Sequence, residues 1–226
     1  MYRWVIKLML DSELVPEQRL VFVDIARKLN VSRTPVNNAL AILAQEGYLD
    51  FVPNQGYAVR RLSRQEKQDL YEIRETIETG FIGQAIRKMT ARPLKNIARK
   101  MAEVDKYLAG NGSRQIFLHD MELHEAILLV AGNVHVMHRY REICQKLYIC
   151  FRPEGIQSSP LHALCEEHDS LYQAVQHKDI DQAREVLRQH RNILETFEKP
   201  QAPDTRARQW RLLGSPASEV AIPYHI

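Results

Sequence analysis

The sequence predicts a mainly α-helical protein in which a small winged helix-turn-helix domain precedes an all-α helical bundle. Two observations predict this class. The chain changes character near residue 62: two short helical patterns and a hairpin come before it, and helical patterns continue after it almost to residue 198. Polar residues also interrupt the apolar stripes of the later helices. The expected division is 1–62, 63–198 and an extended or mobile tail at 199–226, where four prolines occur and no period is sustained.

The first two helices are predicted from their apolar faces. The first helix has about ten residues and a face formed by Leu20, Ile25, Ala26 and Leu29. Asn30-Val31-Ser32 interrupts it, Ser32 suits an N-cap position, and Pro35 fits the first turn of the next helix. Gly47 ends this second helix, whose buried face is Val36, Leu40, Leu43 and Ala44. Two helices joined by a tight turn make a helix-turn-helix.

A hairpin follows these helices. The segments 48–52 and 57–60 alternate between apolar and polar residues, and Pro53-Asn54-Gln55-Gly56 forms a turn between them. A helix-turn-helix followed by a hairpin is a winged helix.

Helical patterns fill the next part of the chain. Ser63 and Glu66 form a capping box that opens a long helix, with an apolar side formed by Leu70, Ile73, Ile77, Phe81 and Ala85. Pro93 should break the chain before an amphipathic helix that ends near Gly110. Further helices are expected at about 113–131, 134–151, 161–177 and 179–198, with a loop at 152–160. The last connection is short, so the final two helices should pack antiparallel.

Bulk composition limits the possible functions. A net charge of +3 permits a nucleic-acid partner without requiring one, so any DNA-binding role must rest on a motif. No run reaches the roughly 18 apolar residues that would span a membrane, and the apolar start at 1–10 lacks the cleavage site of a signal peptide. Three cysteines without paired spacing favour reduced thiols. We therefore expect a cytoplasmic protein with no membrane partner.

Four residues of the helical part form a candidate metal site: Asp120, His124, His168 and His190. Each occupies a position where an amphipathic helix normally carries Leu or Ile, and Asp120 and His124 share one helix face. Unpaired buried polar groups cost roughly 1–3 kcal/mol each, so these residues need a common partner. A divalent ion such as Zn, Ni or Mn accepts imidazole nitrogens and a carboxylate oxygen. A buried His–Asp hydrogen-bond network without metal is the alternative.

The start of the second helix is the candidate DNA-reading face. It carries Ser32, Arg33 and Thr34, with Asn37 and Asn38 one turn later. Arginine can hold phosphate or read guanine, and asparagine can pair with adenine. A helical packing module with ordinary surface polar groups is the alternative.

These motifs resemble the GntR family of bacterial transcription regulators. Residues 29–36, Leu-Asn-Val-Ser-Arg-Thr-Pro-Val, resemble the recognition-helix signature, and Asn54-Gln55-Gly56-Tyr57 continues the pattern. The later part resembles the FadR-like branch with an FCD effector domain: residues 70–74 resemble its start, residues 120–124 its D-x-x-x-H metal motif, and residues 167–168 and 183–190 its last ligand helices. The resemblance covers about residues 5–198 and implies DNA contacts from Ser32, Arg33, Thr34, Asn37 and Gly56.

The chain departs from the family pattern at two places. Asn37 stands where the family usually has arginine, and Phe22 and Val23 stand where it often has a charged residue. Both changes remove expected phosphate or base contacts, so the operator sequence cannot be carried over from the family.

The resemblance also implies an effector role for Arg74, which would grip a carboxylate of the effector beside the metal, at a site left open to water or to that acid. A bidentate arginine–carboxylate pair is a strong and directional anchor. The alternative is a surface arginine paired with Glu78, four residues later.

We therefore expect a homodimeric regulator that binds a double-stranded DNA operator and senses a small organic acid at its metal site, acting as a repressor. The domains should pivot near residues 61–63. A metal-dependent enzyme is one alternative, but Glu122 and Glu125 lack the spacing of a motif such as H-E-x-x-H. A DNA-binding protein with a purely structural metal is the other.

Overall fold

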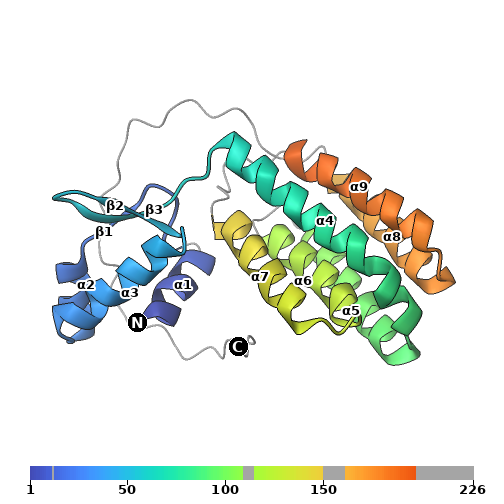
Figure 1. Cartoon of the computed structure of the whole chain (residues 1–226), viewed down its shortest axis with the longest axis horizontal. Coiled ribbons are helices and arrows are strands. Elements are labelled where there is room, and N and C mark those ends of the chain that lie inside the picture. The colour runs from blue at the N-terminus through green and yellow to red at the C-terminus, as the bar shows by residue number, and fades with distance from the viewer. Residues whose placement is uncertain (12, 109–114, 150–160, 197–226) are drawn as a thin grey trace.

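The structure, a computed structural model, describes residues 1–11, 13–108, 115–149 and 161–196. It confirms a mainly helical chain with an N-terminal winged helix and a C-terminal helical bundle (Figure 1). The predicted loop at 152–160 and the tail at 199–226 lie outside the described residues. Within the described part of the chain, no helix has the length and apolar character needed to cross a membrane.

The winged helix contains three helices and three strands. The helices are α1 (Tyr2–Leu10), α2 (Phe22–Leu29) and α3 (Arg33–Gln45). The strands are β1 (Arg19–Leu20), β2 (Leu49–Val52) and β3 (Gly56–Val59), in the antiparallel order β1-β3-β2. The predicted helix pair and hairpin are confirmed.

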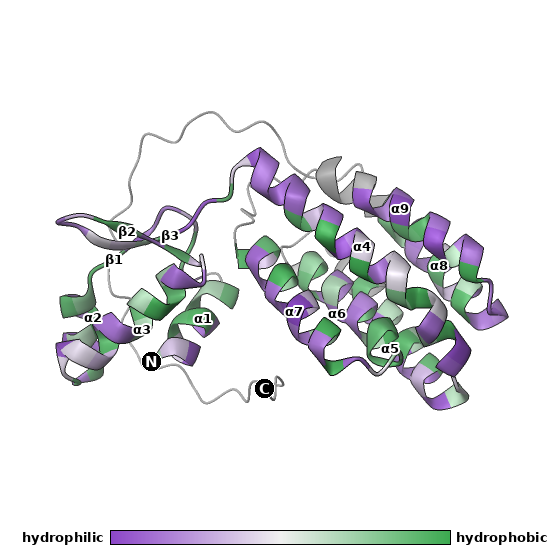
Figure 2. Ribbon diagram, in the orientation of Figure 1, coloured by the Kyte–Doolittle hydropathy of each residue, from purple (hydrophilic) through white to green (hydrophobic). Residues whose placement is uncertain are grey.

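Two features of this domain differ from the prediction. Helix α1 had not been predicted, and it is largely hydrophobic in Figure 2 because Val5, Ile6, Leu8 and Met9 are buried in the domain core. Leu20, predicted on the first helix, instead pairs with Tyr57 in the sheet, and α2 begins two residues later. An apolar residue just before an N-cap fits the periodicity of a helix and that of a strand. Periodicity alone therefore does not decide whether Leu20 belongs to the helix or to the strand.

Left-handed residues close α2 and α3. Asn30 ends α2 with a φ of 51°. Gly47 follows α3 with a φ of 80°, and its N–H donates to the carbonyl of Ala44 while the N–H of Tyr48 donates to the carbonyl of Leu43. This is a Schellman motif, so Gly47 ends the helix as predicted.

Six helices form the described part of the bundle: α4 (Arg64–Lys88), α5 (Ala91–Leu108), α6 (Gln115–Leu129), α7 (Val134–Ile149), α8 (Leu161–His177) and α9 (Ile180–Thr196). Lys178 bridges α8 and α9 in a left-handed conformation, and the two helices pack against each other as predicted. Pro93 does not break the chain. The break is at Met89 and Thr90, and Pro93 lies in the first turn of α5, where no intrahelical N–H bond is lost.

Helix α4 packs most of the predicted side against the core, including Ile77, Phe81 and Ala85, but it departs from the prediction nearer its start. Ile73 is 47% exposed, whereas Arg74 and Glu78 are each only 3% exposed. They continue into Ile82 and Ile86, so the buried stripe has the expected spacing of four residues but contains an ion pair at its start. The apolar pattern did not predict the burial of Glu78 or the exposure of Ile73, whereas the family resemblance had implied that Arg74 reaches the pocket.

Helix α7 joins the two domains. Ile149, the last residue of α7, is fully buried in the same apolar cluster as Leu14, Ile25 and Leu43 of the winged helix. Helix α4 makes the covalent connection, and Arg60 at the end of the hairpin pairs with Glu66 in the first turn of α4. The domain junction therefore has a covalent link through α4 and a packed contact through α7.

The capping box that opens α4 generates a testable prediction. Ser63 Oγ accepts from the N–H of Glu66, and the carboxylate of Glu66 accepts from the N–H of Ser63 at 2.8 Å. The backbone and hydroxyl of Ser63, with Arg60, lower the pKa of Glu66 to about 2 from an ordinary value of 4.5. Because the folded-state pKa is the lower one, this stabilisation is complete above pH 4.5 and is lost as the pH falls toward 2.

Ser63→Ala should therefore lower the free energy of unfolding by about 1 kcal/mol at neutral pH. The difference in the free energy of unfolding between this variant and wild type should become smaller as the pH falls below 4.5. Thermal unfolding at several pH values measures both effects. Ser170→Ala, on the exposed side of α8, is the matched control. A pH-independent difference would show that Glu66 takes no part.

Candidate metal centre and DNA-reading face

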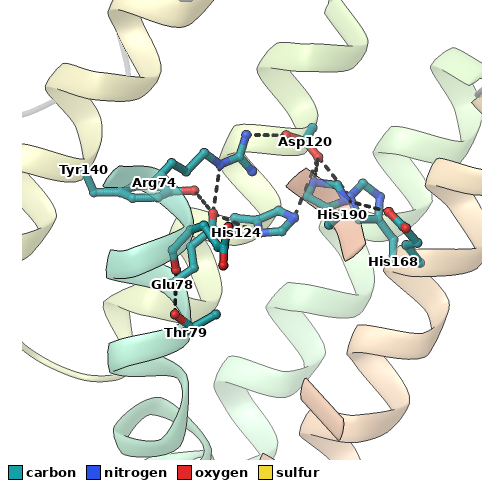
Figure 3. Close-up of polar contacts among 10 residues, drawn as sticks. Arg74, Glu78, Thr79, Asp120, His124, Tyr140, His168 and His190 are labelled. Carbon is teal, nitrogen blue, oxygen red and sulfur yellow. Dashed lines mark hydrogen bonds and ion pairs between the residues drawn. The ribbon is translucent and has the colours of Figure 1, made fainter. Parts of the chain in front are cut away.

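The four predicted metal ligands converge inside the bundle. Asp120 and His124 come from α6, His168 from α8 and His190 from α9, and all four side chains are buried (Figure 3). One donor atom of each lies within 4.8 Å of the others. The spacing of Asp120 and His124 places them on one face of α6, and the antiparallel packing of α8 and α9 brings the remaining two imidazoles together.

One carboxylate oxygen is the centre of this cluster. Oδ1 of Asp120 lies 2.9 Å from Nε2 of His168, 3.0 Å from Nε2 of His190 and 3.7 Å from Nε2 of His124. Among the described residues, Nε2 of His124 and Nε2 of His190 have no hydrogen-bond partner, the latter despite its short distance from Asp120. Two buried imidazole nitrogens without an aligned partner, aimed at one carboxylate oxygen, fit a divalent metal better than a complete hydrogen-bond network.

Two further carboxylates orient the imidazoles from behind. Oε1 of Glu78 is 3.1 Å from Nδ1 of His124, and Oε2 of Glu167 is 3.1 Å from Nδ1 of His190. Metal-binding histidines commonly donate their second N–H to such an acceptor, which fixes the tautomer and the ring orientation. Sequence reasoning missed both carboxylates. The available signal was that Glu167 is adjacent to His168 and that Glu78 lies four residues after Arg74.

Arg74 lies inside the cluster. Its Nε donates to Glu78 Oε1 at 2.9 Å, and its Nη1 donates to Asp120 Oδ2 at 3.0 Å. The alternative of a surface pair with Glu78 is therefore wrong about exposure, although the pairing itself exists. Nη2 is buried and has no hydrogen-bond partner among the described residues, so one N–H edge of the guanidinium is available to a ligand.

Burial and charge set the protonation of the cluster. Burial lowers the pKa of His124 to about 4 and also lowers the pKa of His168. Burial alone would lower the pKa of His190 too, but the nearby charge of Asp120 and the contact with Glu167 raise it to about 9. Burial would raise the pKa of Asp120, yet Arg74 and His190 hold it well below its ordinary value. At neutral pH, His124 and His168 are therefore neutral and Asp120 is ionised, which are the forms that bind metal, whereas His190 is protonated and must lose its proton to bind an ion.

The two carboxylates considered as general bases point to other partners. Glu122 is 2.5 Å from Nζ of Lys100, and Glu125 is 2.6 Å from Nη2 of Arg141. Glu122 also forms a second, half-buried group with Glu103 and His119, where Lys100 supplies the opposing charge. Neither carboxylate belongs to the four-residue centre.

The predicted DNA-reading residues lie at the start of α3 and on the hairpin. Ser32, Arg33, Thr34 and Asn37 are exposed. Ser32 occupies the N-cap position but makes no side-chain cap bond, so its hydroxyl is not used by the helix. Asn37 Oδ1 accepts from the hydroxyl of Tyr57 on β3 at 3.3 Å, which ties the recognition helix to the hairpin.

Gly56 has a structural requirement of its own. Its φ is +91°, and a Cβ atom built there would lie 2.9 Å from the carbonyl oxygen of Leu20. Any other residue would strain the β1–β3 contact. The glycine is thus explained by packing, and its DNA contact stays a prediction.

Comparisons with known proteins agree with this architecture. The FCD domain family matches residues 69–192, and the family described as bacterial regulatory proteins, gntR family, matches residues 2–59. The chain is 24% identical to the HTH-type transcriptional repressor GlaR of Escherichia coli, over 84% of this chain and 90% of that protein. It is 22% identical to the HTH-type transcriptional regulator McbR of the same organism, over 77% and 80%.

Solved structures show the same fold. Escherichia coli McbR/YncC has a TM-score of 0.70 at 20% identity and covers 84% of this chain and 91% of its own. A GntR regulator from Rhodococcus sp. RHA1 has a TM-score of 0.73 at 19% identity, covering 86% and 93%.

The winged helix, the helical bundle and these relatives define a DNA-binding transcription regulator and not an enzyme. The chain belongs to the GntR family of bacterial regulatory proteins, and its helical part is an FCD domain.

The exposed start of α3 generates a prediction for Arg33. Arg33→Ala should weaken binding to a DNA site selected by the wild-type protein by about 1–3 kcal/mol if Arg33 reads a base, or reduce the salt slope by about one if it contacts phosphate. Fluorescence anisotropy at several salt concentrations separates the two results. Arg99→Ala, an exposed residue of α5, is the control. Equal affinity and slope for Arg33→Ala and wild type would contradict the assignment.

Proposed function

We propose that this protein is a ligand-responsive transcription repressor that senses a small organic acid at a divalent metal in its helical domain. The observation that carries this proposal is the environment of Asp120. Three imidazole nitrogens face one of its oxygens, and Arg74 holds the other. A metal-binding face and an anion-binding residue therefore meet at one carboxylate.

Asp120, His124, His168 and His190 would hold the metal. Their three nitrogens and one oxygen suit Zn, Ni or Mn, and ligand type does not choose among these ions. The outer carboxylates Glu78 and Glu167 support the proposal because they fix the orientation of two ligand rings. When bound, the ion would supply positive charge and coordination positions for an anionic ligand.

The effector would be a small carboxylate. Arg74 is buried, and the free N–H edge of its guanidinium can donate to an anion. A hydrogen bond from a charged group in a buried site is roughly twice as strong as a neutral one. Glu78 and Asp120 accept from Nε and Nη1 of the same guanidinium, so a ligand on Nη2 would bind beside the contacts that join α4 to α6.

The repressor role and the homodimer rest on other support. GlaR, a relative of similar length and architecture, is described as a repressor. One winged helix reads one half-site, and a two-fold operator requires two of them. The proposal is therefore a homodimer on a two-fold-related DNA operator.

Selection of DNA from a random duplex pool tests the regulator and the dimer together. The enriched sequence should be an inverted repeat with half-sites about one helical turn apart, or a multiple of it. Enrichment of a single unrepeated half-site would exclude the dimer, and no enrichment would exclude sequence-specific regulation.

The metal proposal predicts one bound divalent ion per chain. His190→Ala should lower metal content and melting temperature together, because an ion bound only by the folded state adds to its stability. Elemental analysis and thermal unfolding with and without a chelator measure this. His138→Ala is the control, since His138 is 62% exposed on α7. Full metal content in both His124→Ala and His190→Ala would overturn the site.

The effector proposal predicts that carboxylate binding requires the planar guanidinium group of Arg74. Arg74→Lys keeps the positive charge but loses the planar donor pair, so it should bind carboxylates about tenfold more weakly than wild type. Calorimetry of the zinc-loaded proteins with acetate, succinate and citrate provides the measurement, with Arg99→Lys as the control. Equal binding to both proteins would remove Arg74 from the role. If none of the acids binds the wild type, a purely structural metal remains.

A further inference from the structure

Helix α7 contacts the centre through the buried side chain of Tyr140. Tyr140 is fully buried, and its hydroxyl donates to Oε1 of Glu78 at 2.6 Å (Figure 3). The same oxygen lies 2.9 Å from Nε of Arg74 and 3.1 Å from Nδ1 of His124. Three groups thus share one acceptor: the effector arginine, a metal ligand and a residue of α7.

A shared acceptor makes these contacts interdependent. A carboxylate oxygen has two lone pairs, so three donors cannot all be optimally aligned with it at once. If Arg74 turns toward an anion, or the ring of His124 shifts to bind an ion, the hydrogen bond from Tyr140 changes in length or direction. The position of Tyr140 therefore depends on what occupies the centre.

The other end of α7 lies in the winged helix. The Tyr148 hydroxyl donates to the carbonyl of Leu10 at the end of α1, and Gln145 accepts from the hydroxyl of Tyr48, each at 3.2 Å. Ile149 completes the apolar core of that domain. Tyr48 belongs to the Schellman motif that closes the recognition helix, so α7 contacts the end of α3.

We infer that α7 transmits the state of the centre to the DNA-reading domain through the hydrogen bond between Tyr140 and Glu78. This inference rests on the proposed function and names its regulatory element. Tyr140 and Tyr148 are two turns apart on one face of a continuous helix, a separation of about 12 Å. A helix moves as a rigid element over that length, so a displacement at Tyr140 reaches Leu10 and Tyr48. The connection before Ser63, where Leu62 is buried in the core of the winged helix, then follows the motion instead of causing it.

Amide hydrogen exchange tests the inference with Tyr140→Phe, which keeps the ring and removes only the hydroxyl. The reporter amides are those of Leu14 and Tyr48, which are hydrogen-bonded in the winged helix. In chelator-treated protein, Tyr140→Phe should raise their exchange by about fivefold, as expected when one hydrogen bond is lost. Tyr172→Phe, a half-buried tyrosine of α8, is the matched control and should leave them unchanged.

The second part of the experiment compares hydrogen exchange with and without added zinc. Adding Zn²⁺ to wild type should change exchange at Leu14 and Tyr48, and Tyr140→Phe should lose most of that change while its zinc content stays equal to wild type. Tyr148→Phe removes the hydrogen bond from α7 to the carbonyl of Leu10 and should also lose most of the zinc response. It replaces Tyr140→Phe if that variant does not fold.

The outcomes separate this inference from the proposed function. Exchange changes confined to α4, α6 and α7 in Tyr140→Phe, or a full zinc response in both variants, would overturn the relay. Failure of wild type to bind zinc by elemental analysis would overturn the metal proposal alone, because the chelator-treated comparison still decides whether α7 connects Tyr140 to the winged helix.

Discussion

The helical domain depends on the neutralisation of one buried carboxylate. Asp120 has no access to solvent, and an isolated charge in that position would be very costly. Arg74 from α4 compensates one of its oxygens, and imidazoles from α6, α8 and α9 surround the other. Four helices must therefore be in place before the charge is compensated. The requirement that sets the chemistry of the centre also fixes how these helices pack.

The sequence was sufficient to predict that Asp120, His124, His168 and His190 lie together, but its apolar pattern did not predict which residues at the start of α4 are buried. His168 and His190 stand out because an imidazole inside an apolar stripe breaks a clear pattern. Arg74 and Glu78 do not stand out by their pattern, since charged residues on a long helix are ordinary, and only the family resemblance pointed to Arg74. They are buried because Arg74 pairs with Glu78 and with Asp120, and His190 supplies the second positive charge beside Asp120. This compensation depends on three-dimensional proximity. Ile73 is exposed as a consequence.

The remaining differences have similar causes. Helix α1 is a short apolar segment, and such a segment satisfies helix and strand patterns equally well. The outer carboxylate Glu167 occupies a position that is polar in any amphipathic helix, so only its distance from His190 distinguishes it. Caps and turns were predictable, because Ser63 with Glu66, Asn30 and Gly47 act within a few residues of chain. Contacts between residues close in the sequence can be predicted from it, whereas charge compensation between helices that are distant in the sequence cannot.

The bond between Asn37 and Tyr57 has a consequence for the redesign of operator specificity. One route to a new operator specificity is to graft the recognition helix of a relative onto this domain. In this chain that graft would replace Asn37 with the arginine usual in the family and leave the Tyr57 hydroxyl without its acceptor on α3. The recognition helix and the hairpin should therefore be exchanged together, from Ser32 to Val59. A chimaera that receives only the helix would lose the hydrogen bond between the two elements.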